Sequence, residues 1–313
     1  MKNLASPKPR LFLGFIITFV GSILFSTKAI IVKKAFADTS LDALTLLTLR
    51  MVFSLPFFLV TAFFLSNQTS NVKLTGAQWM QVLMLGLVGY YLSSYFDFVG
   101  LQYISAGLER LILFLYPTFV LLMNRVFFRQ VMTGTQLIAL LLTYSGIGIA
   151  YFNEMQFDTN NPNFFLGSAL IFLCSITYAF YITGSGKVIP IVGASKFTAY
   201  AMLSATMGIF IHYVLRGDYS GFNEATGMWG YGLMLGILAT VVPTFLLSAG
   251  LLRIGANNVA IISAVGPVST ILQAHWFLGE PIHTGQMVGT ALVIAGVLLI
   301  GWRTSGGRKI LSK

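Results

Sequence analysis

The sequence predicts an all-α membrane protein with ten transmembrane helices, arranged as two five-helix repeats of opposite orientation. Composition is the first of three observations behind this fold class. Hydrophobic residues make up 56% of the 313 residues, charged residues make up only 9%, and the mean hydropathy is +0.82. A soluble chain carries about 25% charged residues, so this chain has too little charge to face water on all sides. The other two observations are a series of apolar runs and an internal repeat.

A membrane-spanning helix needs about 20 mostly apolar residues, and the chain contains ten such runs. They are predicted at 11–32, 42–65, 77–97, 104–123, 133–152, 164–185, 195–215, 228–249, 255–277 and 284–302. The connections between them are short, which leaves no room for a water-soluble domain. The first run follows a basic segment and lacks a small-residue cleavage site, so we interpret it as a retained span and not as a signal peptide.

The second half of the chain repeats the first with a constant offset of 150 residues. Equivalent positions keep the same residue in the pairs Gly100 and Gly250, Ile104 and Ile254, Pro117 and Pro267, and Gly146 and Gly296. Each half contains an odd number of spans, so the second half must cross the membrane in the opposite direction. Inverted repeats of this kind are typical of transporters, in which the substrate site lies between the halves.

The predicted organisation follows from the repeat and from the basic residues. It comprises a tail at 1–10, a first repeat at 11–152, a linker at 153–163, a second repeat at 164–302 and a tail at 303–313. Placing the N-terminus in the cytoplasm puts most lysines and arginines of the connections on the cytoplasmic side, as such residues prefer. Both termini are therefore predicted to be cytoplasmic. The short basic tails and the lack of a targeting peptide favour a bacterial inner membrane.

Both halves share the outline Gly-Leu-x-x-Ile-x-Ala, then a proline within the helix, a short polar turn and a Gly-rich helix. In the second half the turn reads Phe277-Leu278-Gly279-Glu280-Pro281. Together with ten spans in an inverted repeat, this outline resembles the EamA branch of the drug/metabolite transporter superfamily over nearly the whole chain. The first half departs from that pattern, because Arg129-Gln130 stand where the second half has Gly279-Glu280. The resemblance implies a carrier of small metabolites, often an exporter, and leaves the substrate undefined.

Ionisable residues inside spans cost free energy, so each is a candidate functional group. Five are predicted at similar depth in the outer third of the first half: Lys28, Arg50, Asp97, Glu109 and Arg110. In a functional interpretation, Arg50 or Arg110 binds a substrate carboxylate or phosphate. Glu109 or Asp97 then binds a substrate amine or a coupling proton. In a structural interpretation, Asp97 pairs with Arg110 across the turn, and Glu109 pairs with Lys28 or Arg50.

All five charges lie in the first half, and Val259-Ala260 stand opposite Glu109-Arg110 in the second repeat. Helix packing alone would favour similar residues in both halves. The difference therefore favours a role for Glu109 and Arg110 in substrate binding or in an outer gate.

Further substrate-binding candidates carry a ring with a hydroxyl, or a small polar group, inside a span: Tyr90, Ser94, Tyr116, Tyr178, Tyr181 and Asn257. An amphipathic ring suits a solute of mixed polarity, although the same tyrosines also suit a packed core. Candidate hinges or kinks are Pro117, Pro243 and Pro267, because a proline within a helix removes a backbone hydrogen bond. The alternative for the prolines is a fixed bend that shapes each helix for packing.

These features predict a secondary transporter, with export as the expected direction. It would move a small amphipathic metabolite, such as an amino acid, by alternating access at the midplane between the repeats. The sequence contains no Walker loop, no catalytic motif and no metal-ligand spacing, so we expect no catalytic residue, metal or cofactor. Its expected partners are a small-molecule substrate, the lipid bilayer and coupling protons, and not nucleic acid. The alternative is a membrane-embedded enzyme that uses the charge cluster to act on a lipid-linked substrate.

Overall fold

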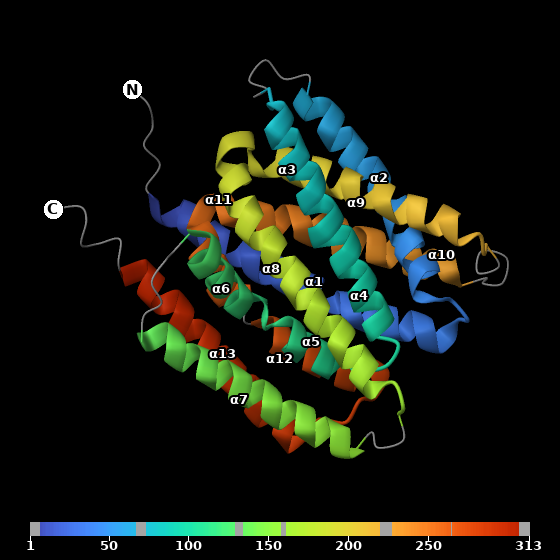
Figure 1. Cartoon of the computed structure of the whole chain (residues 1–313), viewed down its shortest axis with the longest axis vertical. Helices are drawn as coiled ribbons and strands as arrows, with labels where there is room; N and C mark the ends of the chain where they lie inside the picture. The colour runs from blue at the N-terminus through green and yellow to red at the C-terminus, as the bar shows by residue number, and fades with distance from the viewer. Residues whose placement is uncertain are drawn as a thin grey trace.

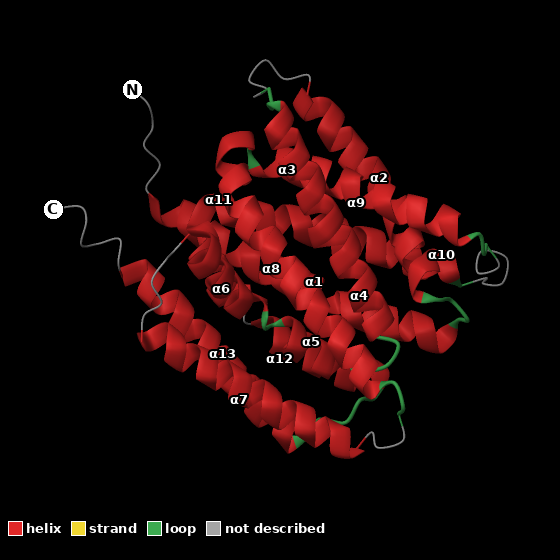
Figure 2. Cartoon of the chain, in the orientation of Figure 1, coloured by secondary structure: helices red, strands yellow, loops and turns green. Residues whose placement is uncertain are grey.

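The computed structural model describes residues 7–66, 73–128, 134–157, 161–219, 227–263 and 265–306. Within these ranges every regular element is a helix, and no strand occurs (Figure 2). The elements are α1 (Pro7–Asp38), α2 (Ala43–Ser66), α3 (Gly76–Gly86), η1 (Leu87–Leu92), α4 (Ser93–Gly100), α5 (Ala106–Leu113), α6 (Tyr116–Phe128), α7 (Gly134–Phe157), α8 (Phe164–Val192), α9 (Ala194–Arg216), α10 (Met228–Leu233), η3 (Met234–Val241), α11 (Val242–Ser263), α12 (Val265–Leu278) and α13 (Thr284–Gly306). The predicted all-α fold class is confirmed.

Eight helices in the described part of the chain are long and apolar enough to cross a membrane. They correspond to the first eight predicted spans. Three of these spans are each made of two or three helical segments that follow one another in the chain. Gly76–Gly100 contains α3, η1 and α4, Ala106–Phe127 contains α5 and α6, and Met228–Ile254 contains α10, η3 and the first part of α11. Helices α12 and α13 occupy the predicted ninth and tenth spans.

The turn between the eighth and ninth spans differs from the prediction. Helix α11 continues to Ser263, beyond the predicted start of the ninth span at 255. It does not run straight, because a Cβ atom placed on Gly250 would lie only 3.6 Å from Val259 Cγ2. A straight helix would separate these positions by about 13 Å. The chain therefore reverses within α11, where no proline interrupts residues 250–263, and α12 begins later than predicted.

The helices pair across the two halves in a symmetric pattern. Helices α7 and α13, the last of each half, lie along each other (Figure 1), and α2 pairs with α9. Helix α1 packs on α11 and η3 of the second half, whereas α8 packs on η1 and α4 of the first half. Helix α5 also packs on α12, which is the repeat counterpart of α6. The pairs of α7 with α13 and of α2 with α9 are symmetric, and the contacts of α1 and α8 are equivalent, as expected for two inverted copies related by an axis in the membrane plane.

Glycines bring α7 and α13 together. A Cβ atom on Gly146 would lie 2.5 Å from the carbonyl oxygen of Gly289, and one on Gly289 would lie 2.4 Å from that of Gly146. Small residues of this kind allow helix backbones to approach closely within a membrane. This pair therefore joins the outermost helices of the two halves along one edge of the bundle.

The helix ends next to the connections after the first, third, fifth, seventh and ninth spans, which are outer if the N-terminus is cytoplasmic, lie on the face where α1 ends, whereas α1 begins and α13 ends on the opposite face (Figure 1). The contacts that join them are an Arg216–Asp42 ion pair and hydrogen bonds from Tyr231 to Asp38, from Lys33 Nζ to the Ile104 carbonyl (3.0 Å), from Asn161 Nδ2 to the Tyr103 carbonyl (2.6 Å) and from the Ala106 amide to Glu280 Oε1 (3.1 Å). They link the ends of helices from both halves at this face.

Candidate functional site

Lys28 of α1 joins two buried carboxylates. Its Nζ atom lies 2.6 Å from Asp97 Oδ2 on α4 and 3.6 Å from Glu109 Oε1 on α5. All three side chains are buried, and a charge inside a span is stabilised chiefly by partners of this kind. The pairing of Glu109 with Lys28 agrees with the structural interpretation of the cluster. One ammonium group therefore holds three helices of the first half at a single point.

Arg50 of α2 is buried and makes its hydrogen bonds to hydroxyl groups. Its Nε atom donates to Thr240 Oγ1 at 2.7 Å, and its Nη1 atom donates to Ser94 Oγ at 3.1 Å. Its guanidinium carbon lies 5.5 Å from the centroid of the Phe98 ring. Because Thr240 belongs to η3 in the second half, Arg50 connects the two halves through its side chain.

Arg110 of α5 lies beside this network but has no acidic partner of its own. Its Nε atom is buried without a hydrogen-bond partner, and among the described residues no carboxylate forms an ion pair with it. Its guanidinium carbon lies 5.6 Å from the centroid of the Phe25 ring. The predicted Asp97–Arg110 pair is therefore wrong. The reason is that Lys28 reaches Asp97 from α1.

Two small cavities, each of about 30 Å³, lie among these side chains. The first is lined by residues that include Lys28, Arg50, Tyr90, Ser94 and Asp97. The second is lined by residues that include Ser22, Arg110, Tyr116, Leu247 and Ser263. Phe25, Leu113 and Tyr178 line both cavities and separate them. Each cavity has room for about one water molecule, so the centre of the bundle is closed to a metabolite in this structure.

The structure brings together most of the residues singled out in the sequence. Those that line one of the two cavities are Lys28, Arg50, Tyr90, Ser94, Asp97, Arg110, Tyr116 and Tyr178. Glu109 is fully buried against Lys28. Tyr181 lines neither cavity and packs on Tyr90, with 4.9 Å between ring centroids. The side chain of Asn257 lies outside the described part of the chain.

Sequence reasoning missed several residues of the centre. Phe25 separates the two cavities, and Cys174 lines the first of them. Ser22 Oγ lies 3.0 Å from Ser263 Oγ, which connects α1 to α11. A signal for Ser22 was present, because Thr18, Ser22 and Ser26 recur every four residues along α1. That spacing places small polar side chains on one face of an otherwise apolar helix.

Backbone irregularities lie beside the cavities in both halves. The π-helices η1 and η3 occupy overlapping positions in the two repeats, and π-helical segments frequently occur at functional sites. Pro117 follows the break between α5 and α6, and Pro243 is the second residue of α11, just after η3. Pro267 is the third residue of α12. The role of these prolines as hinges remains a prediction.

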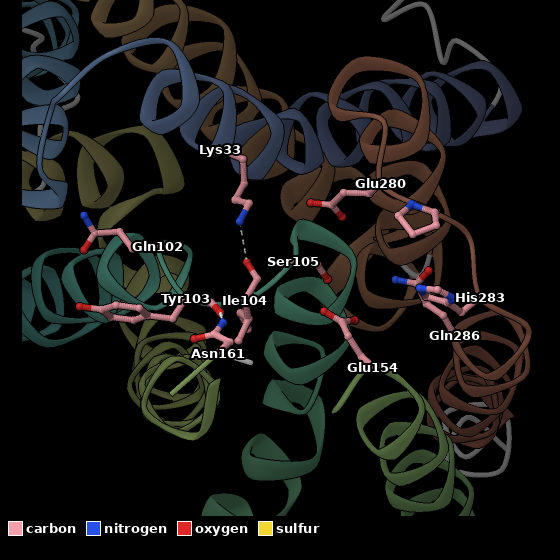
Figure 3. Close-up of a pocket in the computed structure, with 11 residues that line it drawn as sticks. Lys33, Gln102, Tyr103, Ile104, Ser105, Glu154, Asn161, Glu280, His283 and Gln286 are labelled. Carbon is pink, nitrogen blue, oxygen red and sulfur yellow. Dashed lines mark hydrogen bonds between the residues drawn. The ribbon is translucent and has the colours of Figure 1, made fainter. Parts of the chain in front are cut away.

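A larger polar cavity, of about 370 Å³, lies at the face where α1 ends. Figure 3 shows Lys33, Glu154, Glu280 and Gln286 around it, and the α5 helix behind it. The Ala106 amide at the start of α5 donates to Glu280 Oε1 across the boundary between the halves. Since Glu109 and Arg110 belong to this helix, α5 connects the outer cavity to the central charges.

An inverted helical repeat that encloses a polar site between its halves is the architecture of a membrane transport protein. The model of the EamA-like transporter family matches both halves, over residues 12–152 and 165–302. The chain therefore belongs to the EamA-like transporter family.

Similar proteins agree with this assignment. The chain is 28% identical over 289 residues to the uncharacterized transporter YcbK of Bacillus subtilis (strain 168), covering 88% of each protein. It is 22% identical to the WAT1-related protein At5g64700 of Arabidopsis thaliana, over 98% of this chain and 93% of that protein. A solved crystal structure shares the fold, with a TM-score of 0.64 and 14% identity over 92% of this chain and 95% of that one. The bacterial relative is named as a transporter and not as an enzyme.

Proposed function

We propose that this chain is a secondary transporter that exports a small amphipathic metabolite, such as an amino acid, by alternating access. The central cavities support this proposal more than any other observation. They are lined from both halves, contain charged and aromatic side chains, and measure only about 30 Å³ each. A metabolite would bind only after the halves move apart at one face, and the repeat provides two equivalent ways of doing so.

The proposed motion opens one face while the other stays closed. At the face where α1 ends, opening would separate Glu280 from the start of α5. The π-helices and the proline-associated breaks would absorb the bending, because their backbones are already irregular. The basic residues support an orientation with both termini in the cytoplasm of a bacterial cell, and hence transport across its inner membrane.

Proton coupling is part of the proposal. Asp97 and Glu109 share one ammonium group, so protonation of either carboxylate would leave Lys28 paired with the other. A proton could thus be taken up or released while the helices stay connected. The two carboxylates are the proposed coupling groups because they are buried side chains of the central cluster and lie next to the cavities.

Reconstitution tests the proposal. The full-length protein in liposomes should exchange labelled amino acids by counterflow, whereas protein-free liposomes should not. An imposed proton gradient should drive accumulation of the transported solute. If no solute crosses and a lipid-linked compound is chemically altered instead, the protein is an enzyme and the transporter proposal is wrong.

A further inference from the structure

Arg110 differs from Lys28 and Arg50 because its guanidinium has no ion pair or hydrogen bond with any residue in the described part of the chain. Lys28 lies against Asp97 and Glu109, and Arg50 donates to two hydroxyl groups. The cluster therefore contains three cations and two carboxylates, with one positive charge in excess. An unbalanced buried charge destabilises a fold, which makes a purely structural role for Arg110 unfavourable.

The structure holds the Arg110 guanidinium against a glycine of the other half. A Cβ atom on Gly266 would lie 2.5 Å from Arg110 Nη2, so any side chain at this position would displace the guanidinium. The repeat-related residue is Tyr116, and its ring lines the same cavity as Arg110. At these equivalent positions the second half has a glycine, which leaves space for the Arg110 guanidinium. The first half has a tyrosine, whose ring forms part of the cavity wall.

The remaining walls of this cavity are mainly apolar. Besides Arg110, they include Phe25, Phe114, Tyr116, Tyr178 and Leu247. The rings of Tyr116 and Tyr178 meet edge to face, with 5.0 Å between their centroids. A solute that enters here meets one cation and several rings, which suits an anionic group attached to an apolar body.

We propose that Arg110 binds the carboxylate of the transported solute, and that the substrates are carboxylates with an apolar or aromatic body. This inference rests on the proposed transport function and specifies its substrate class. A single excess charge matches a carboxylate, whereas a phosphate carries about two negative charges. The planar guanidinium can donate two parallel hydrogen bonds to a carboxylate.

A matched series of ligands tests the inference on the purified full-length protein. The probes are phenylacetate, L-phenylalanine and phenethylamine, which share a ring and differ in charge, together with isovalerate and isoamylamine. The measurement is the shift of the thermal unfolding midpoint as each probe is titrated. The carboxylates and L-phenylalanine should raise the midpoint, and the simple amines should not. If no carboxylate in the series raises the midpoint, the inference is overturned.

Variants then assign the effect to Arg110. Arg110→Gln should weaken carboxylate binding about tenfold to a hundredfold, as expected for the loss of a hydrogen bond to a charged group, and Arg110→Lys should weaken it less. Gly266→Ala should also weaken binding, because its methyl group displaces a guanidinium that is still present. The control is Arg253→Gln, which removes the same charge from an exposed side chain that donates to the Ala249 carbonyl, and it should leave binding unchanged.

The unfolding midpoint of the ligand-free protein distinguishes a binding role of Arg110 from a structural role. If Arg110 is kept for binding, Arg110→Met should raise the unfolding midpoint of the ligand-free protein, because an unbalanced buried charge is removed. A lowered midpoint would overturn the inference and assign Arg110 to the fold. Undiminished counterflow of L-phenylalanine by Arg110→Gln would also overturn it, while leaving the transport function intact. Carboxylate binding at Arg110 without any transport would instead refute only the transport function.

Discussion

Lys28 illustrates how a single side chain organises the centre of a membrane protein. Its position near the end of an apolar run identified it as a candidate and as one of two possible partners of Glu109, but its ion pair with Asp97 did not follow from the sequence. Helix α1 is apolar apart from the face of Thr18, Ser22 and Ser26 and the basic residues near its ends, and this pattern does not show which helices lie against Lys28. The rotation of α1 is set by packing against α11 and α12. The sequence therefore predicted which charges form the cluster but only part of how they pair.

Replacing Lys28 with methionine should strongly destabilise the protein. The variant leaves Asp97 and Glu109 buried without the ammonium group that pairs with both, and breaking a buried ion pair in this way costs about 3–5 kcal/mol. The expected result is a large loss of monodisperse protein on size-exclusion chromatography and a lower unfolding midpoint.

The matched control removes all three charges of this network at once. Lys28→Met combined with Asp97→Asn and Glu109→Gln should recover much of the lost stability, because neither carboxylate charge remains buried without its ammonium partner. If the single variant is as stable as the wild type, the Lys28 network does not hold the helices together, and the contacts of α1 with the second half would carry that role alone.

At the level of elements, the turn after α12 directs a carboxylate at the other half. Gly279 has a φ of 70°, a left-handed conformation that glycine adopts without strain. The Glu280 amide donates to the Ala274 carbonyl at 3.2 Å, and His275 Nδ1 lies 3.0 Å from the Glu280 carbonyl oxygen. The sequence identified this turn as a family motif. Its partner, the Ala106 amide 174 positions away, could not be predicted because it depends on how the halves dock.

A disulfide across this contact should stop transport. A Cβ atom on Gly107 would lie 3.2 Å from Gln286 Cδ, so the two positions face each other, and cysteines there form a disulfide when their Cβ atoms come within about 3.5–4.5 Å. Oxidation of the Gly107→Cys/Gln286→Cys variant would fasten α5 to α13 at the face where α1 ends. Counterflow should cease on oxidation and return after reduction.

The chain suits this experiment because its one native cysteine, Cys174, is buried. One control is Gln286→Cys alone. The other is Gly107→Cys combined with Gln286→Ala, because the glutamine side chain would otherwise clash with the new cysteine at position 107. Both should keep their activity under the same oxidant. Full counterflow by a completely cross-linked protein would mean that the gate does not lie between α5 and α13.

For the whole molecule, the duplication predicted more than any single motif did. The constant offset of 150 residues predicted two inverted halves, and the symmetric helix pairs have that arrangement. The reversal within α11 was not predictable, because an apolar run without proline does not show where a helix folds back. The closed state of the centre was also not predictable. Two similar halves allow the centre to open to either side of the membrane, and the sequence does not show whether an open or a closed state is the more stable.

Cys174 offers a natural reporter of those states. It is the single cysteine of the chain, it lines the first central cavity, and it is only 2% exposed. A charged thiol reagent that does not cross membranes should therefore reach it only while the centre is open to the side of application. We expect slow labelling from both sides of reconstituted vesicles, protection by L-phenylalanine, and no labelling of Cys174→Ser.

Weakening one gate should then change the two labelling rates in opposite directions. Glu280→Ala removes the carboxylate that binds the Ala106 amide in the closed arrangement, a hydrogen bond to a charged group that contributes about 1.5–3 kcal/mol. Labelling from the face where α1 ends should rise, and labelling from the opposite face should fall, because the two open states draw on one population. A rise at both faces would indicate general loosening of the bundle. A rise at one face with a matching fall at the other is the result that only two mutually exclusive openings of a single central site explain.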